Sequence, residues 1–188
     1  MEENTAKKSV GREILEWIAC ILVALIITFI LRNFVFTLVR VDGTSMVPTL
    51  EHGERLVMVR LGYEPEKGDI VIVDPDIPNG AGGKGAMFIK RIIGMPGDTI
   101  QLEANANSSV TLYVNGEAQE EAYISSTFYG QNIGTGEYTV PEGHVFVMGD
   151  NRPNSRDSRD GSVGFIPYDH VLGEAVFRIW PMSRIGKP

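Results

Sequence analysis

The sequence predicts a mostly β protein, in which an N-terminal transmembrane helix precedes a partly open, barrel-like β domain with a small β insertion. Two observations support this fold class. An apolar run without charge, proline or glycine occupies residues 18–31, whereas the remaining chain holds short segments rich in β-branched and aromatic residues. The whole chain contains 21 glycines and 10 prolines, which break it into short segments, and no long amphipathic helix follows the apolar run. A length of 188 residues suits one main domain with a small appendage.

The apolar run is interpreted as an uncleaved membrane anchor over residues 14–36. This extended stretch has 23 residues, and about 20 are needed to cross the hydrocarbon core of a bilayer. Glu16 marks one boundary, and Arg32 can extend its charge to the other interface. The residues after the run, R-N-F-V-F-T, lack the small side chains of a signal-peptide cleavage site. The run also lacks the polar face of a buried core helix.

Flanking charges predict the orientation of this anchor. Lys7, Lys8 and Arg12 precede the apolar run, while Arg32 and Arg40 follow it, so the positive-inside tendency mildly favours a cytoplasmic N-terminus. The expected organisation is a cytoplasmic N-terminus at 1–13, the anchor at 14–36 and an extracytoplasmic domain at 37–188. The protein would then be a single-pass protein of the cell membrane, in contact with the lipid bilayer.

Composition excludes several function classes. The net charge is −7, and residues 41–188 hold twelve basic against twenty acidic side chains. The domain therefore lacks the basic stripe that nucleic-acid binding requires. Cys20 is the one cysteine, which rules out an intrachain disulfide. The three histidines do not have the spacing of zinc ligands, and we expect neither a metal nor a cofactor.

Strands are expected after residue 40, at residues 55–60, 69–73, 110–114, 144–148 and 174–179. Asn115-Gly116 predicts a tight hairpin, because both residues tolerate positive φ. The hairpin lies within residues 99–140, a more polar stretch that we interpret as the small insertion. Residues 76–86 are expected to form a flexible linker, since their G-G-K-G lacks the complete phosphate-loop pattern.

Ser45 and Lys90 are the candidate nucleophile and base. A serine hydroxyl needs a group that takes its proton, and lysine does this only when its amine is neutral. The lysine pKa must then fall from about 10.4 toward roughly 7–8, which burial in apolar surroundings produces. The apolar neighbours of Lys90 are Met87, Phe88, Ile89, Ile92 and Ile93. Taken alone, Ser45 also fits a backbone cap in a surface turn, and Lys90 a solvated lysine at a strand edge.

A third stretch, residues 149–159, is too polar for a core strand and fits a dense loop of internal hydrogen bonds. Its acidic and basic side chains can pair with one another, and Ser155 offers a hydroxyl able to orient an amine. A solvated charged loop and a cation-binding loop are the alternatives. The EF-hand template fails, because its terminal glutamate is missing.

Four motifs that follow the anchor in this order together resemble type I signal peptidase. They are S-M-V-P-T-L, G-D-I-V-I-V, K-R-I-I-G-M-P-G-D and G-D-N-R-P-N-S-R-D-S-R. This family consists of membrane-anchored Ser/Lys endopeptidases that cleave signal peptides from exported preproteins. The resemblance runs from the anchor to about residue 180. It implies that Ser45 is the nucleophile, Lys90 the general base, and Ser155 the hydroxyl bonded to the lysine amine. It implies supporting ion-pair roles for Arg91, Asp150, Arg152, Asp157 and Arg159.

Gly43 departs from the proteobacterial form of the family, in which a serine at this position adds its hydroxyl to the oxyanion hole. Short Gram-positive-like members also have glycine there, so the hole would rely on backbone N–H groups, with Gly43 and the Ser45 backbone forming it. One lost donor costs ~3 kcal/mol if nothing replaces it. The family also implies a shallow apolar pocket for small residues at P1 and P3, lined by Val41, Met46, Leu50, Phe88 and Ile89. Plain core packing is the alternative for Met46.

The resemblance implies that the substrates are signal-peptide-bearing preproteins, cleaved near the secretion translocon. A self-cleaving Ser/Lys peptidase of the repressor type fits less well, because an anchor stands where a DNA-binding domain would be. A membrane-tethered β domain that binds a partner without catalysis is a third reading, but it gives no reason for an apolar-flanked lysine. His52 lies seven residues after Ser45, but no acid is placed to orient it as a base.

Overall fold

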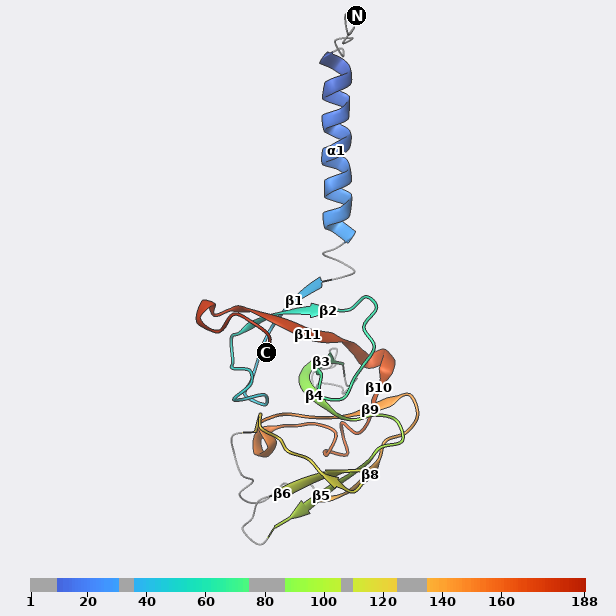
Figure 1. Ribbon diagram of the computed structural model, residues 1–188, viewed down its shortest axis with the longest axis vertical. Coiled ribbons are helices and arrows are strands. Elements are labelled where there is room, and N and C mark those ends of the chain that lie inside the picture. The colour runs from blue at the N-terminus through green and yellow to red at the C-terminus, as the bar shows by residue number, and fades with distance from the viewer. Residues whose placement is uncertain (1–9, 31–35, 75–86, 106–109, 125–134) are drawn as a thin grey trace, which may run out of the picture.

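The computed structural model describes residues 10–30, 36–74, 87–105, 110–124 and 135–188. Helix α1 (Val10–Ile30) projects away from a β body that contains all the strands (Figure 1). In the part of the chain that the structure describes, no helix combines the length and the apolar character needed to cross a membrane. Phe36, expected to close the anchor, is instead the first residue of strand β1 (Phe36–Arg40), where its backbone pairs with Val59.

The larger sheet contains seven antiparallel strands in the order β1-β2-β11-β3-β4-β9-β10. The sheet is open, with β1 and β10 at its edges, and it curls into a half-barrel (Figure 1). Register shifts in the β11 pairings, and between Ile92 and Gly94 in β4, bend the strands and favour this curl. The remaining strands are β2 (Arg55–Val59), β3 (Ile70–Val73), β4 (Phe88–Gly94), β9 (His144–Met148), β10 (Ile166–Pro167) and β11 (Val171–Trp180).

The predicted insertion at residues 99–140 forms a second, four-stranded sheet in the order β7-β6-β5-β8. Asn115 has φ 54° and Gly116 has φ 79°, so the predicted hairpin is confirmed. Asn115 also accepts the Thr99 N–H through Oδ1 at 2.9 Å and donates from Nδ2 to Asp98 at 2.7 Å. The strands are β5 (Thr99–Ala104), β6 (Val110–Val114), β7 (Glu117–Ala118) and β8 (Gly136–Thr139).

The five strands expected from the sequence are confirmed as β2, β3, β6, β9 and β11. Their ends differ by at most one residue, except that β11 begins at Val171, three residues early, because it continues along β3. The expected linker at 76–86 lies outside the described residues.

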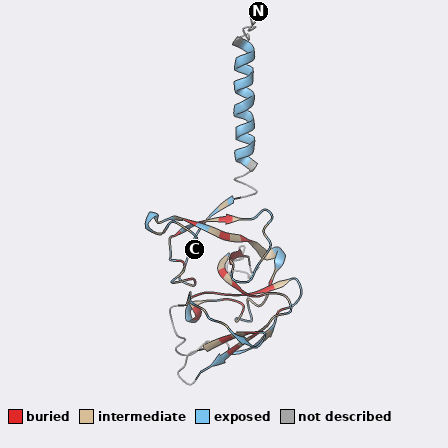
Figure 2. Ribbon diagram, viewed as in Figure 1, coloured by how far each residue is buried: buried red, intermediate tan, exposed pale blue. Residues whose placement is uncertain are grey.

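Among the described residues, three apolar clusters form the core. Figure 2 shows that the buried residues lie along the strands of both sheets, whereas α1 is exposed. One cluster packs the turn after β1 against β2 and β3, through residues such as Met46, Leu50 and Met58. Another contains residues of both sheets, and in it the rings of Tyr138 and Phe146 lie with their centroids 4.9 Å apart. Because β4 and β9 supply residues to the clusters on both sides of them, they form a fixed central platform.

Candidate active site

Ser45 and Lys90 are brought into direct contact across the curled sheet. Ser45 lies in the turn of residues 42–50, which follows β1, and Lys90 lies on β4 opposite Val71 of β3. The Lys90 Nζ is 2.8 Å from the Ser45 Oγ and also donates to the Ile89 carbonyl at 3.1 Å. This is the separation that proton transfer between a nucleophile and a base requires.

Burial lowers the pKa of Lys90 from 10.5 to about 8, because water is removed from its charged form. Only 3% of the residue is exposed, so it is not a solvated lysine at a strand edge. Asp157 opposes the shift by favouring the ammonium, Arg159 adds to the shift, and Asp150 opposes it again. The Phe88 ring lies 5.1 Å from Nζ and covers the amine. With a pKa of about 8, about a tenth of the Lys90 amine is neutral at pH 7, far more than for an ordinary lysine.

The polar loop, residues 149–159, is hydrogen-bonded to main-chain carbonyl groups of the Ser45 turn. Asn151 donates its main-chain N–H to the Ser45 carbonyl at 2.9 Å and its Nδ2 to the Thr44 carbonyl at 3.0 Å. Asp157 is 1% exposed and accepts the Gly149 N–H at 3.0 Å. The prediction of a loop organised by internal hydrogen bonds is therefore confirmed.

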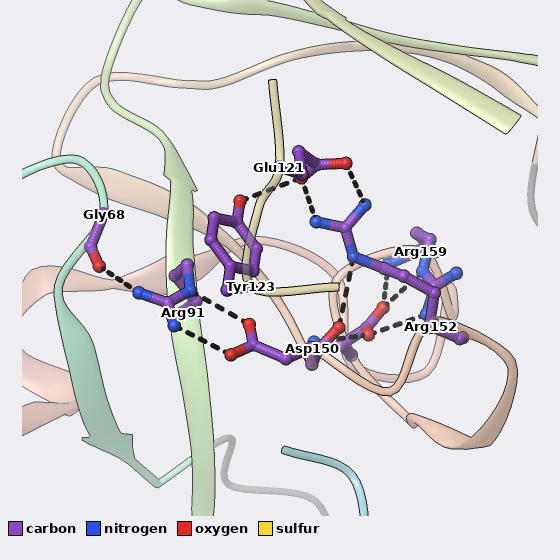
Figure 3. A network of polar contacts seen from close by, with 9 residues as sticks. Gly68, Arg91, Glu121, Tyr123, Asp150, Arg152 and Arg159 are labelled. Carbon is purple, nitrogen blue, oxygen red and sulfur yellow. Dashed lines mark hydrogen bonds and ion pairs between the residues drawn. The ribbon is translucent and has the colours of Figure 1, made fainter. Parts of the chain in front are cut away.

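Ion pairs surround the site, and Figure 3 shows how their members lie. Arg91 forms a two-point pair with Asp150, with nitrogen–oxygen distances of 2.9 and 2.7 Å, and donates to the Gly68 carbonyl at 2.8 Å. Arg159 forms a similar pair with Asp157, with both distances 2.8 Å. These four side chains thus form ion pairs with one another, as the sequence predicted.

Arg152 pairs outside the predicted set, with Glu121 of the insertion. Glu121 lies next to Tyr123, whose ring covers Arg91 in Figure 3. Sequence reasoning missed both residues. Neither belongs to a motif or a periodic pattern, and their partners are about 30 residues away along the chain.

Ser155 does not make the expected hydrogen bond to Lys90. Its Oγ is buried and has no hydrogen-bond partner among the described residues, while the Lys90 amine contacts Ser45 and Ile89 instead. Ser155 packs at the Gly149 backbone: a Cβ added to Gly149 would lie 2.3 Å from the Ser155 Oγ and 2.4 Å from the Ser45 carbonyl oxygen. The hydroxyl thus lies beside the Ser45 main chain.

The Gly43 N–H, expected at the oxyanion hole, points to another partner. Gly43 has φ 99° and donates to the Nδ1 of His52 at 3.2 Å. The same nitrogen lies 3.2 Å from Asp42, a contact that the sequence analysis did not predict. A neutral Nδ1 accepts from Gly43, whereas a protonated one pairs with Asp42. His52 therefore braces the Ser45 turn.

A cleft runs along the Ser45–Lys90 contact. Val41, Met46, Phe88 and Ile89 line it, as expected. Leu50 does not line the cleft: it is fully buried and packs in the core beneath the turn, because the turn directs it inward. The sequence analysis missed part of the lining, made of Val39, Arg40, Ile72, Asn154 and Arg156.

Comparisons with known proteins agree with this geometry. A family model described as "Signal peptidase, peptidase S26" matches residues 14–180. Signal peptidase I of Bacillus licheniformis is 40% identical over 99% of this chain and 97% of that protein. Signal peptidase I T of Bacillus subtilis strain 168 is 39% identical, over 97% and 93%. Signal peptidase IB of Staphylococcus aureus strain COL is 37% identical, over 92% and 93%. The resemblance found in the sequence is confirmed. The chain belongs to the signal peptidase family, peptidase S26, and its activity is that of a signal peptidase I.

Proposed function

We propose that Ser45 is the nucleophile and Lys90 the general base in the cleavage of signal peptides from secreted preproteins. The contact of 2.8 Å between Nζ and Oγ is the observation that carries the proposal. The lowered pKa of Lys90, about 8, supports it, because an ordinary lysine would be almost fully protonated near neutral pH.

In this mechanism, the neutral amine of Lys90 takes the proton of Ser45 as the Oγ attacks the carbonyl carbon of the P1 residue. The tetrahedral intermediate collapses when the leaving amine receives this proton, and an acyl-enzyme remains on Ser45. Lys90 then takes a proton from water as the water oxygen attacks the ester, and it gives this proton to the Ser45 Oγ when the cleaved signal peptide is released. Every proton is accounted for by Lys90, so the reaction as written requires no metal or cofactor.

The Ser45 backbone N–H is proposed as the main donor to the developing oxyanion. Gly43 can join it only by exchanging its bond to His52 for one to the substrate. Ser155 supports the site by packing beside the Ser45 carbonyl. The pairs Arg91–Asp150 and Arg159–Asp157 hold charges of fixed sign near Lys90.

Small residues at P1 and P3 are the proposed specificity. The apolar lining by Val41, Met46, Phe88 and Ile89 suits short side chains such as alanine, and it keeps water away from the amine. Arg40 and Arg156 add positive charge at the same cleft. A preprotein segment bound there in extended form would place its scissile carbonyl beside Ser45.

A single-pass anchor in the cell membrane is proposed for the apolar segment that begins at residue 14, with 1–13 cytoplasmic and the domain from Phe36 onward extracytoplasmic. Large apolar side chains are exposed along α1, including Trp17 at 72% and Leu15 at 67%, and such a surface is suited to lipid. The β body lies beyond the C-terminal end of α1 (Figure 1). An anchor near the translocon raises the effective concentration of substrate, because signal peptides occupy the same bilayer.

The test is cleavage of a preprotein with an Ala-x-Ala site by full-length protein in lipid vesicles. Ser45→Ala and Lys90→Ala are each expected to abolish cleavage while the protein still folds and inserts. A folded Ser45→Ala protein that cleaves at the wild-type rate would remove Ser45 from the mechanism. In sealed inverted vesicles, protection of residues 37–188 from added protease would support the proposed orientation. Digestion of these residues would show the opposite orientation.

A further inference from the structure

Glu121 of the insertion reaches across to the polar loop and meets Arg152 there (Figure 3). Its two carboxylate oxygens accept from the two terminal nitrogens of the guanidinium, one of them at 2.9 Å. The Arg152 side chain is 1% exposed and that of Glu121 is 10% exposed. The two-point geometry fixes the orientation of both planes, so the contact specifies a position as well as a charge.

Arg152 connects this contact to both ends of the polar loop. Its Nε donates to the Gly149 carbonyl at 3.2 Å, and its own carbonyl accepts from Arg159 at 2.7 Å. Gly149 begins the loop and packs on the Ser45 carbonyl, while Arg159 is paired with Asp157 near the Lys90 amine. A displacement of Arg152 therefore acts on the surroundings of Ser45 through its side chain and on those of Lys90 through its main-chain carbonyl.

Tyr123 provides a second connection from the same segment. Its hydroxyl donates to Glu121 at 2.8 Å, and its ring centroid lies 4.1 Å from the Arg91 guanidinium carbon. Arg91 follows Lys90 on β4 and pairs with Asp150 of the loop. Glu121 and Tyr123 thus contact two arginines that also bind the polar loop, Arg152 at the Gly149 carbonyl and Arg91 at the Asp150 carboxylate.

We propose that Glu121 is a positioning residue for catalysis, acting through Arg152 to hold the polar loop against the Ser45 turn. The proposal rests on the proposed roles of Ser45 and Lys90. It assigns the insertion a part in the reaction, although the insertion's strands lie in a separate sheet. Loss of the carboxylate leaves a buried guanidinium without this partner, and the loop must shift to hydrate it. The shift would move the Ser45 carbonyl through Gly149 and Asn151.

The experiment compares Glu121→Gln, Glu121→Asp and the control Glu120→Gln in full-length protein in lipid vesicles. Glu120 is the exposed neighbour of Glu121. We measure Tm, and then kcat and KM for a signal-peptide substrate well below the lowest Tm. For Glu121→Gln we expect kcat to fall about tenfold or more with KM within about twofold, because a small misplacement of catalytic groups acts on the chemical step. Glu121→Asp keeps the charge and should retain more activity, and Glu120→Gln should match wild type.

A folded Glu121→Gln protein with wild-type kcat would overturn the proposal, as would equal losses in Glu121→Gln and Glu120→Gln. If Glu121→Gln does not fold, Tyr123→Phe tests the proposal instead, because it removes only the hydroxyl bonded to Glu121. A kcat of Tyr123→Phe several-fold below wild type supports the proposal, and an unchanged kcat overturns it. Ser45→Ala is run beside these variants. Activity in Ser45→Ala would refute the proposed nucleophile, whereas an inactive Ser45→Ala with wild-type Glu121→Gln would refute only the role of Glu121.

Discussion

The main-chain N–H of Asn151 donates to the carbonyl oxygen of Ser45 over 2.9 Å. This bond joins the polar loop to the nucleophile without any side chain, so the alignment of Ser45 depends on how closely the two backbones approach. Gly149, two residues earlier, has no side chain at the point of closest approach. The position of Ser45 relative to Lys90 therefore depends on the steric fit between the two backbones as much as on charge.

Gly149→Ala is expected to lower kcat by about a hundredfold, because the added methyl would meet the Ser155 Oγ at 2.3 Å and the Ser45 carbonyl oxygen at 2.4 Å. The backbone of the Ser45 turn must then shift away from residue 149, which changes the position of Ser45 relative to Lys90. Gly161→Ala is the matched control, since a Cβ at that position would meet nothing within 4 Å. Steady-state cleavage by both variants checks this, and comparable rates would show that the close approach does not matter.

The pH dependence of kcat/KM should report the protonation of Lys90. Burial lowers its pKa to about 8 in the folded protein, and only the neutral amine accepts the Ser45 proton. Activity should therefore rise about tenfold per pH unit below this value and level off above it. A rate profile measured with a substrate free of titrating groups tests this, and a flat profile between pH 6 and 8 would argue against a lysine base.

Lys90→Met is expected to abolish activity and to raise stability at neutral pH. The unfolded chain binds a proton on Lys90 up to its ordinary pKa of 10.5, while the folded protein releases it above about 8. The contribution of Lys90 to stability thus rises with pH across this window and is lowest below it. Removing the amine should add up to ~3 kcal/mol at pH 7, less the lost contact with Ser45.

Urea denaturation of wild type and Lys90→Met at pH 7 and at pH 10 measures that difference. The advantage of the methionine variant should shrink at the higher pH. An advantage that stays constant or grows with pH would contradict a lowered pKa at this position.

Arg178→Ala should destabilise the fold by about 3 kcal/mol, because it removes the Nη1 group that contacts both oxygens of the Glu54 carboxylate, a residue that is 2% exposed. Arg178 also donates to the Thr49 carbonyl at 3.1 Å, at the end of the Ser45 turn. The loss is limited because Arg184 still lies 2.9 Å from Glu54. Exposed Arg55 on the neighbouring strand is the control, and thermal unfolding of Arg55→Ala should show a much smaller change. Similar losses in the two variants would show that the buried pair is not the cause.

Local patterns were sufficient to predict β2, β3, β6, β9 and β11, the Asn115-Gly116 hairpin and the burial of Lys90, because each depends on residues adjacent in sequence. The partner of Arg152 could not be predicted in this way. Glu121 reaches it only after the insertion has folded onto the half-barrel, and many carboxylates in this acidic chain are equally plausible from sequence. The inward direction of Leu50 and the bond from Gly43 to His52 likewise depend on the conformation of one turn.

The C-terminal boundary of the apolar helix could not be predicted from the local sequence either. Phe36 is as apolar as the run before it, and only its pairing with Val59 shows that it belongs to the sheet. Apolar character alone does not distinguish a helix end from the start of an edge strand.

The most direct test of the central claim is titration of the Lys90 amine itself by NMR, using lysine labelled with ¹³C at Cε in the full-length protein. Lys90→Met identifies the resonance by its absence. We predict a pKa of about 8, coincident with the kinetic limb, whereas titration near the ordinary value of 10.5 would contradict a neutral base beside Ser45.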